Sequence, residues 1–334
     1  MKNSAADRMM LTIFALFCLA PLAHCQGLEM YAAPHLYATC TTSTTRLLGM
    51  GGILSCIQDR GFSNPAFGGD IEHSYVAGQV SLTEFTGGLE LRGLQFTAGT
   101  AIEPNTQGIQ LTAFELDSHA GGLQSTSGPL RATIDEDDVA IQYGRRIDEH
   151  WLLGLGASPI FRTSTNLYHP TTGAQLGHID SDSDFGFRFG AVHQFDARTT
   201  AGAIYDRYDD DVVAQGLMFG GMQAATFNCY TMTLGACHQF ADRVLAGAEW
   251  REVVVKGAGV RTGDAGFRVG LEVTTPRAWA FRLGSNDGAL SAGVGFARGR
   301  WSIDYAYADD WNDDLVGHFL GGSDTHELEV RYEW

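Results

Sequence analysis

Alternation between apolar and polar side chains, beginning near residue 71 and continuing to the carboxyl terminus, restricts the fold more than any other feature. Successive side chains of a β-strand point to opposite faces, so alternation with period two predicts strands. The pattern predicts about fourteen strands. They fall within residues 71–85, 89–101, 109–117, 137–147, 151–164, 183–195, 199–208, 228–240, 243–254, 265–274, 278–284, 290–297, 300–308 and 326–334.

The connections between these segments are sorted by length. The inner turns are short, at 148–150, 196–198, 241–242, 275–277 and 298–299, and only 102–108 is longer. The outer connections include the long segments 118–136, 165–182, 209–227 and 309–325. Bacterial outer-membrane barrels have short periplasmic turns and long extracellular loops, whereas a soluble sandwich has no reason to sort its connections. We therefore predict an all-β fold, a transmembrane antiparallel barrel of about 14 strands over residues 71–334.

The amino terminus has the features of a targeting segment. Lys2 and Arg8 precede a short apolar stretch that ends near Ala23, and this predicts a signal peptide over residues 1–25 with cleavage after Cys25. Acylation of Cys25, as in a lipoprotein, and an uncleaved anchor are the alternatives. We expect the mature chain to be exported to the cell outer membrane, where lipid surrounds it.

Charge and motifs exclude several functions. The net charge of −17 argues against nucleic acid, which attracts basic surfaces, and against simple attraction to anionic lipid. No Gly-x-Ser-x-Gly or His-Glu-x-x-His motif is present, so we predict no catalytic residues, no enzyme activity and no cofactor. Loop histidines near acidic residues leave an Asp/His hydrolase as an alternative.

Acidic clusters fall in or beside the expected outer loops, at 135–138, 180–184, 209–211, 309–310 and 313–314. Solvated loop charge is the simplest interpretation. Asp180, Asp182 and Asp184 alternate like the ligands of a calcium loop, but the Gly and Glu of an EF-hand are missing, so we predict no metal site and keep these three as a calcium alternative.

Four cysteines follow the predicted signal peptide: Cys40, Cys56, Cys229 and Cys237. An oxidising compartment permits disulfides. Cys229 and Cys237 would lie on one face of one strand, too far apart to bond to each other. A bond between Cys40 and Cys56 and four unpaired cysteines both stay open.

Strand parity assigns the opposite faces of each strand to lipid and lumen. The predicted lumen-facing residues carry charges of both signs, which could pair across the barrel: Arg188, Glu249, Arg251, Arg268, Glu272, Arg282, Asp304, Glu327, Glu329 and Arg331. The last strand turns Leu328, Val330, Tyr332 and Trp334 toward lipid and ends on an aromatic residue. We expect this apolar end to be the signal that the barrel-assembly machinery recognises.

Residues 26–70 lack strict alternation but contain two motifs. Gly49-Met50-Gly51-Gly52 followed by Asn64-Pro65-Ala66 resembles the amino-terminal signature of the outer-membrane long-chain fatty-acid transporter superfamily. The segments 279–284, 290–296, 303–307 and 326–328 resemble its PorV-like branch. The resemblance implies a fourteen-stranded barrel in which residues 26–70 form a lumenal hatch. The usual Gly-Leu after Asn-Pro-Ala is replaced here by Phe67 and Gly68.

Two functions follow from this interpretation. The first is passage of small hydrophobic molecules across the outer membrane, gated by residues 26–70. The alternative, implied by the PorV-like resemblance, is an accessory that binds exported proteins through its extracellular loops. A closed barrel with a structural role is a third possibility.

Overall fold

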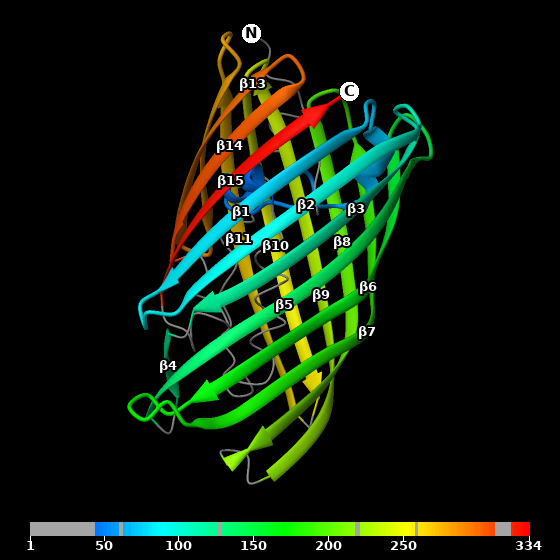
Figure 1. Ribbon diagram of the computed structural model, residues 1–334. Helices are drawn as coiled ribbons and strands as arrows, with labels where there is room; N and C mark the ends of the chain where they lie inside the picture. The colour runs from blue at the N-terminus through cyan, green and yellow to red at the C-terminus, as the bar shows by residue number, and fades with distance from the viewer. Residues whose placement is uncertain are drawn as a thin grey trace.

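A computed structural model describes residues 44–59, 63–119, 121–125, 128–217, 221–257, 260–310 and 322–334. The fold is a closed antiparallel barrel with fourteen wall strands (Figure 1). These are β1 (Tyr75–Phe85), β2 (Glu90–Glu103), β3 (Gln107–His119), β5 (Gly128–Arg146), β6 (Trp151–Tyr168), β7 (Gln175–Gln194), β8 (Thr199–Gly216), β9 (Gly221–Ala241), β10 (Val244–Gly257), β11 (Val260–Thr274), β12 (Trp279–Asn286), β13 (Ala289–Arg298), β14 (Trp301–Asp309) and β15 (Ser323–Glu333).

The barrel is closed by two pairings that join strands distant in sequence or order. β1 pairs with β15, and β3 pairs with β5, while the short strand β4 (Gly121–Ser125) pairs with β5 alone. Every wall strand therefore has a hydrogen-bonded neighbour on both sides, and the barrel wall has no free edge. Each of the predicted segments overlaps one wall strand, so the predicted barrel and its strand number are confirmed.

Short turns lie at the end of the barrel that carries the carboxyl terminus, which we call the carboxyl-terminal rim; the opposite end is the loop rim. The turn between β5 and β6 is representative. The carboxylate of Asp148 accepts hydrogen bonds from the backbone N–H groups of His150 and Trp151, both at 2.8 Å. These bonds lower the pKa of Asp148 and fix the turn.

The predicted long loops are corrected by the structure. Only residues 169–174 separate β6 from β7, and β9 begins at Gly221, soon after β8 ends at Gly216. The acidic clusters at 135–138 and 180–184 lie within β5 and β7, and that at 209–211 lies within β8, rather than in loops. Residues 311–321 lie outside the described residues.

Several strands are longer than the alternation in the sequence predicts. Along such a strand the outward face changes from apolar to charged toward the loop rim, and the inward face changes from polar to apolar. Near the carboxyl-terminal rim, β5 turns apolar Ile141 outward. Nearer the loop rim it turns Asp135 and Asp137 outward and buries Ile134 and Ala132 inside. The register is continuous, so the same parity that faces outward changes from apolar to charged. A prediction that requires apolar residues on the same face throughout therefore makes the strand too short, as it did for β5.

Around the barrel, the outward face carries a band of exposed apolar side chains. Leu94, Leu283 and Trp301 are each more than half exposed. Tryptophans gather at the carboxyl-terminal rim, where the ring of Trp301 lies 4.7 Å from that of Tyr332. An apolar band bordered by aromatic rings is the outward surface of a barrel that faces lipid.

The amino-terminal part of the described chain lies inside the barrel (dark blue in Figure 1). We call residues 44–59 and 63–70 the lumenal segment. It contains the short helix α3 (Thr45–Leu48) and the 3-10 helix η1 (Pro65–Asp70). η1 contacts β3, β5, β6 and β7, whereas α3 contacts β13, β14 and β15, so the segment reaches across the lumen. Within the described residues no helix is long and apolar enough to cross a membrane.

Candidate functional site

A ring of glycines on the inner wall receives the lumenal segment, and we call it the glycine belt. At Gly202 an added Cβ would lie 1.8 Å from the carbonyl oxygen of Ser55, and at Gly284 it would lie 2.0 Å from the backbone nitrogen of Gly51. Any side chain at these positions would overlap backbone, so glycine permits the contact. The belt takes one residue from each of β3 and β5 to β13: Gly108, Gly144, Gly154, Gly190, Gly202, Gly235, Gly247, Gly270, Gly284 and Gly293.

A buried carboxylate fastens the middle of the lumenal segment to β10. Glu249 is 0% exposed, and its Oε2 accepts hydrogen bonds from the backbone N–H of Leu54 at 2.9 Å and of Ser55 at 2.7 Å. The Ser55 hydroxyl donates to the same oxygen at 2.7 Å. Arg268 balances the charge, with Nη1 at 3.4 Å from Glu249 Oε1 and 2.8 Å from the carbonyl oxygen of Gly52. Wall and segment therefore share one charged network.

A second network ties α3 to β11 and β12. Arg46 Nη2 lies 2.7 Å from Glu272 Oε1, and Arg282 donates to Glu272 and to Asp304, both at 2.6 Å. Burial alone would lower the pKa of Arg46, but the adjacent Glu272 carboxylate raises it above its ordinary value. The guanidinium is therefore a permanent charge inside the barrel, held by a wall carboxylate.

Further charged contacts lie on either side of these two networks. Arg331 Nη2 lies 3.3 Å from Asp59 of the lumenal segment and 2.6 Å from Glu329 of its own strand. On the opposite wall Arg188 Nη1 donates to the carbonyl oxygen of Ser63 at 3.4 Å. Charged side chains of the wall therefore contact both parts of the segment.

The structure places all ten predicted lumen-facing residues inside the barrel. Arg331 is 11% exposed at its side chain, and the other nine are buried. Those with hydrogen bonds or ion pairs described above are Arg188, Glu249, Arg268, Glu272, Arg282, Asp304, Glu329 and Arg331; Arg251 and Glu327 are also buried. Sequence reasoning missed the partners Arg46 and Asp59. The signal for Arg46 was a single charge within residues 30–58, whereas Asp59 stands next to Arg60 and had no comparable signal.

The first predicted hatch motif forms the turn after α3. The helix ends at Leu48 with Gly49 as its C-cap, and Gly51 and Gly52 have φ of 76° and 73°, which favours glycine. Met50 is fully buried, and its carbonyl oxygen would lie 2.2 Å from a Cβ on Gly270. The motif therefore combines a left-handed turn with close contact to the glycine belt.

The second predicted motif caps η1 and joins it to the wall. The Asn64 side chain accepts from the backbone N–H of Ala66 at 3.0 Å, and Pro65 occupies the first turn. The Asn64 amide also donates to three carbonyl oxygens, those of Ser55 at 2.8 Å and of Ala191 and Ala203 at 3.2 Å. One amide therefore joins both parts of the lumenal segment to β7 and β8.

Asn64→Asp is expected to loosen the lumenal segment. The carboxylate removes the donor and faces three carbonyl oxygens, and leaving buried groups unsatisfied costs about 1–3 kcal/mol, more when a charge is involved. We expect faster proteolysis of residues 44–70 in folded barrels, measured by mass spectrometry of the released peptides. Asn105→Asp, the same change at an exposed turn residue, should leave proteolysis unchanged. Equal proteolysis of the two variants would contradict the anchoring role.

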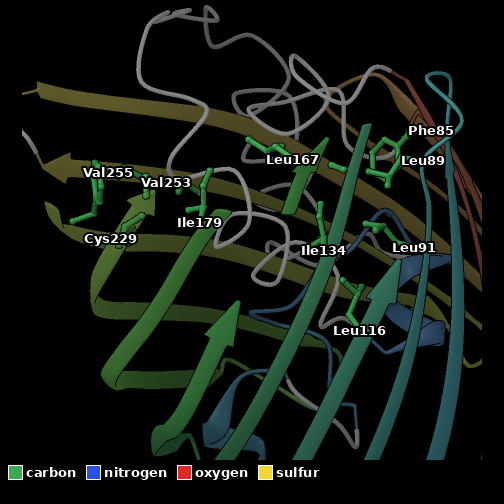
Figure 2. Packing of buried hydrophobic residues seen from close by; sticks show 14 of the residues in the cluster. Phe85, Leu89, Leu91, Leu116, Ile134, Leu167, Ile179, Cys229, Val253 and Val255 are labelled. Atoms are coloured by element: carbon green, nitrogen blue, oxygen red, sulfur yellow. The ribbon is translucent and has the colours of Figure 1, made fainter. Parts of the chain in front are cut away.

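Toward the loop rim the inner wall is apolar, and we call this lining the apolar bowl (Figure 2). Its side chains project inward from β1 to β3, the adjoining turn and β5 to β10. Leu116 and Leu167 are only 2% and 3% exposed. Sequence reasoning missed it, because the inner face was expected to be small or charged. The bowl comprises Phe85, Leu89, Leu91, Phe114, Leu116, Ala132, Ile134, Leu167, Ile179, Val212, Ala214, Phe227, Cys229, Val253 and Val255.

Polar side chains follow the bowl on the inner face of β5, toward the glycine belt; we call them the polar level. Glu136, Asp138 and Gln142 are 3%, 7% and 4% exposed. Within the described residues, neither carboxylate oxygen of Glu136 has a hydrogen-bond partner, and the Thr163 hydroxyl on β6 has none either. Buried polar groups that protein does not satisfy require water or a ligand. The polar level is therefore a band of buried polar groups on β5 and β6 between the bowl and the glycine belt.

The structure does not bring the described residues of the calcium alternative together around one site. Asp180 pairs with His178 at 2.7 Å, and Asp182 lies 3.6 Å from Arg162 on the outward face of the wall. The side chain of Asp184 lies outside the described part of the chain. Among the side chains that the structure describes, no three acidic, His or Cys residues form a group that could hold a metal ion.

Three solved structures illustrate the similarity of this architecture to known barrels. The Ralstonia pickettii toluene transporter TbuX superposes with a TM-score of 0.63 at 14% identity, covering 88% of this chain and 99% of its own. The CymD monoaromatic hydrocarbon channel gives 0.60 at 13%, covering 86% and 96%. A Pseudomonas aeruginosa FadL homologue gives 0.57 at 15%, covering 87% and 98%.

The sequence itself matches no protein-family model and no curated protein. At 13–15% identity, similarity to a solved structure establishes fold. Strand number, closure and near-complete coverage agree with the barrel architecture derived above. The chain therefore has the fold of the FadL-like hydrocarbon transporters, a closed fourteen-stranded barrel.

Proposed function

We propose that this protein passes small hydrophobic molecules across the outer membrane. The apolar bowl carries the proposal: large apolar side chains face the inside of the barrel toward the loop rim, above the level where the outer surface is apolar. A water-filled pore has a polar interior, so an apolar lining favours solutes that leave water readily. The similarity to TbuX, a toluene transporter, and to CymD, a monoaromatic hydrocarbon channel, supports this class of substrate.

The outward apolar band supports a place in the outer membrane, with lipid as the surrounding partner. The terminal strand supports an assembly signal. Leu328, Val330 and Trp334 are exposed on its outward face, and the Tyr332 ring packs against Trp334. We infer that the barrel-assembly machinery recognises this edge before β15 pairs with β1. The predicted signal peptide lies outside the described residues.

The proposed route has three stages. A hydrophobic molecule first enters the apolar bowl, where burial of its surface contributes about 25 cal/mol per Å². It then reaches the polar level, where Glu136 and its neighbours favour release from the apolar lining. Finally it passes the lumenal segment, which occupies the lumen beside the glycine belt. In this proposal residues 26–70 are the hatch that excludes polar solutes.

The test compares uptake into proteoliposomes. Leu116→Asp places a charge in the apolar bowl, and we expect it to reduce uptake of radiolabelled toluene to near the rate of protein-free liposomes. Leu116→Met conserves volume and polarity and should retain uptake. Glucose uptake should be low for all three proteins. Uptake of toluene unchanged by Leu116→Asp, in barrels shown to be folded by heat-modifiable gel mobility, would refute passage through the bowl.

The accessory role implied by the PorV-like resemblance is a separate proposal. It requires extracellular loops large enough to hold exported proteins. Two of the loops predicted for this purpose, 165–182 and 209–227, are mostly strand. Co-purification of an exported protein, abolished by shortening 309–325, would favour the accessory role over passage.

A further inference from the structure

Two cysteines meet where the lumenal segment contacts the wall. Cys56 belongs to the segment and is 1% exposed, and Cys237 belongs to β9 and is 6% exposed. Both are free thiols in this structure. The Cys237 thiol donates to the carbonyl oxygen of Cys56, with Sγ and O 3.1 Å apart, and the two thiols also contact each other. They are 181 positions apart in sequence, so only the docked segment brings them together.

The glycine belt creates this close approach. An added Cβ on Gly202 would lie 3.1 Å from Cys56 Cα, and one on Gly235 would lie 3.2 Å from Cys56 Sγ. Cys237 follows Gly235 by two positions and therefore points from the same face of β9. A disulfide requires Cα atoms about 4.4–6.8 Å apart, and a segment seated directly on glycines brings its backbone near that range.

The other cysteines do not compete within the described chain. Cys229 also points inward from β9, but eight positions from Cys237 correspond to about 26 Å along a strand. It lies in the apolar bowl rather than beside the lumenal segment. Cys40 lies outside the described residues, so a bond between Cys40 and Cys56 is an outcome that the test must distinguish.

We propose that Cys56 and Cys237 form a disulfide that covalently fastens the lumenal segment to β9. The step is exchange with the disulfide of a thiol oxidoreductase outside the cytoplasm. One protein thiolate attacks that disulfide and releases a thiolate of the oxidoreductase; the second protein thiolate then displaces its other sulfur. Two protein thiols are oxidised, one disulfide of the oxidoreductase is reduced to two thiols, and two protons move from the protein thiols to the released thiolates. Because both cysteines are buried in the docked state, the first exchange precedes complete docking, and docking then brings the second thiolate to the mixed disulfide.

The cross-link constrains how the barrel can conduct. A covalently fastened segment cannot leave the lumen as a unit, so molecules that cross must move between the segment and the wall. This inference rests on export of the chain. The test of the disulfide detects a covalent bond, and the test of passage measures uptake. Either proposal can therefore fail while the other stands.

The test is peptide mapping of the full chain, isolated from membranes, denatured in N-ethylmaleimide so that every free thiol is labelled, and digested without reduction. We expect one cross-linked peptide pair joining Cys56 to Cys237, while Cys229 carries the label. Labelled Cys56 and Cys237, or a peptide pair joining Cys56 to Cys40, would overturn the proposal. Heat-modifiable gel mobility shows that the isolated protein is folded.

Two single variants give matched controls. Cys229→Ser should leave the cross-linked pair intact, because Cys229 lies in the bowl. Cys237→Ser should leave Cys56 labelled. A Cys237→Ser protein whose Cys56 stays protected from label after denaturation would show that Cys56 has another covalent partner, and would overturn the assignment.

Discussion

Gly202→Val is expected to displace the lumenal segment and to open the barrel to polar solutes. The Cβ of any residue at this position would lie 1.8 Å from the Ser55 carbonyl oxygen, and the atoms it meets are backbone rather than the end of a flexible side chain. Overpacking typically costs about 1–3 kcal/mol, and here displacement of the segment relieves it more readily than movement of the hydrogen-bonded wall. The measurement is glucose entry into proteoliposomes, which should rise well above that of the unaltered protein.

Gly78→Val is the matched control. Gly78 also lies in a wall strand, β1, but it faces outward, and no atom lies within 4 Å of an added Cβ. This variant should retain the low glucose entry of the unaltered barrel. If the two valine variants behave alike while both remain folded, the glycine belt does not hold the lumenal segment. In a cross-linked barrel, reduction should be needed for the full effect of Gly202→Val.

The barrel could be predicted from sequence because its two strongest signals are local. Alternation within a strand such as β11 identifies two faces without knowledge of its neighbours. Short turns such as 148–150 limit how adjacent strands connect. Closure of the barrel requires a further pairing, between β1 and β15, which joins the first wall strand to the last. The resemblance at both ends of the sequence implied the same strand number.

The candidate site was less predictable, because it depends on where the polarity of the two faces of a strand reverses and on which residues of distant segments lie side by side. β5 turns Ile134 inward at one height and Ile141 outward at another, so no single polarity rule assigns both. The abundance of glycine was visible, but only the fold reveals that Gly202 and Gly284 face the same segment from different sides of the barrel. A contact such as Cys56 with Cys237 likewise needs the docked lumenal segment.

Charged residues fall between these cases. Parity was sufficient to select Glu249 and Arg268 as inward-facing residues, and the structure buries both. It could not select their partners, because the backbone N–H groups of Leu54 and Ser55 have no sequence signature. The sequence therefore predicted that charges of both signs pair inside the barrel, but it did not predict the backbone hydrogen bonds by which Glu249 anchors the lumenal segment.

Glu249→Leu is expected to produce the largest loss of anchorage. It leaves the backbone N–H groups of Leu54 and Ser55 without their acceptor and removes the carboxylate opposite Arg268. Removing one partner of a buried ion pair typically costs about 3–5 kcal/mol. We expect a lower temperature for loss of heat-modifiable mobility and rapid proteolysis of residues 44–59 in barrels that remain folded.

Glu249→Gln should be intermediate, because its amide oxygen can still accept from Leu54 and Ser55 while the charge opposite Arg268 is lost. Glu252→Leu is the control, since Glu252 lies on the same strand with opposite parity, facing away from the lumenal segment. It should preserve the protection of residues 44–59. The order Glu252→Leu, Glu249→Gln, Glu249→Leu in increasing proteolysis would separate the loss of charge from the loss of the acceptor. Equal protection in all three would mean that the glycine belt holds the segment without help from this carboxylate.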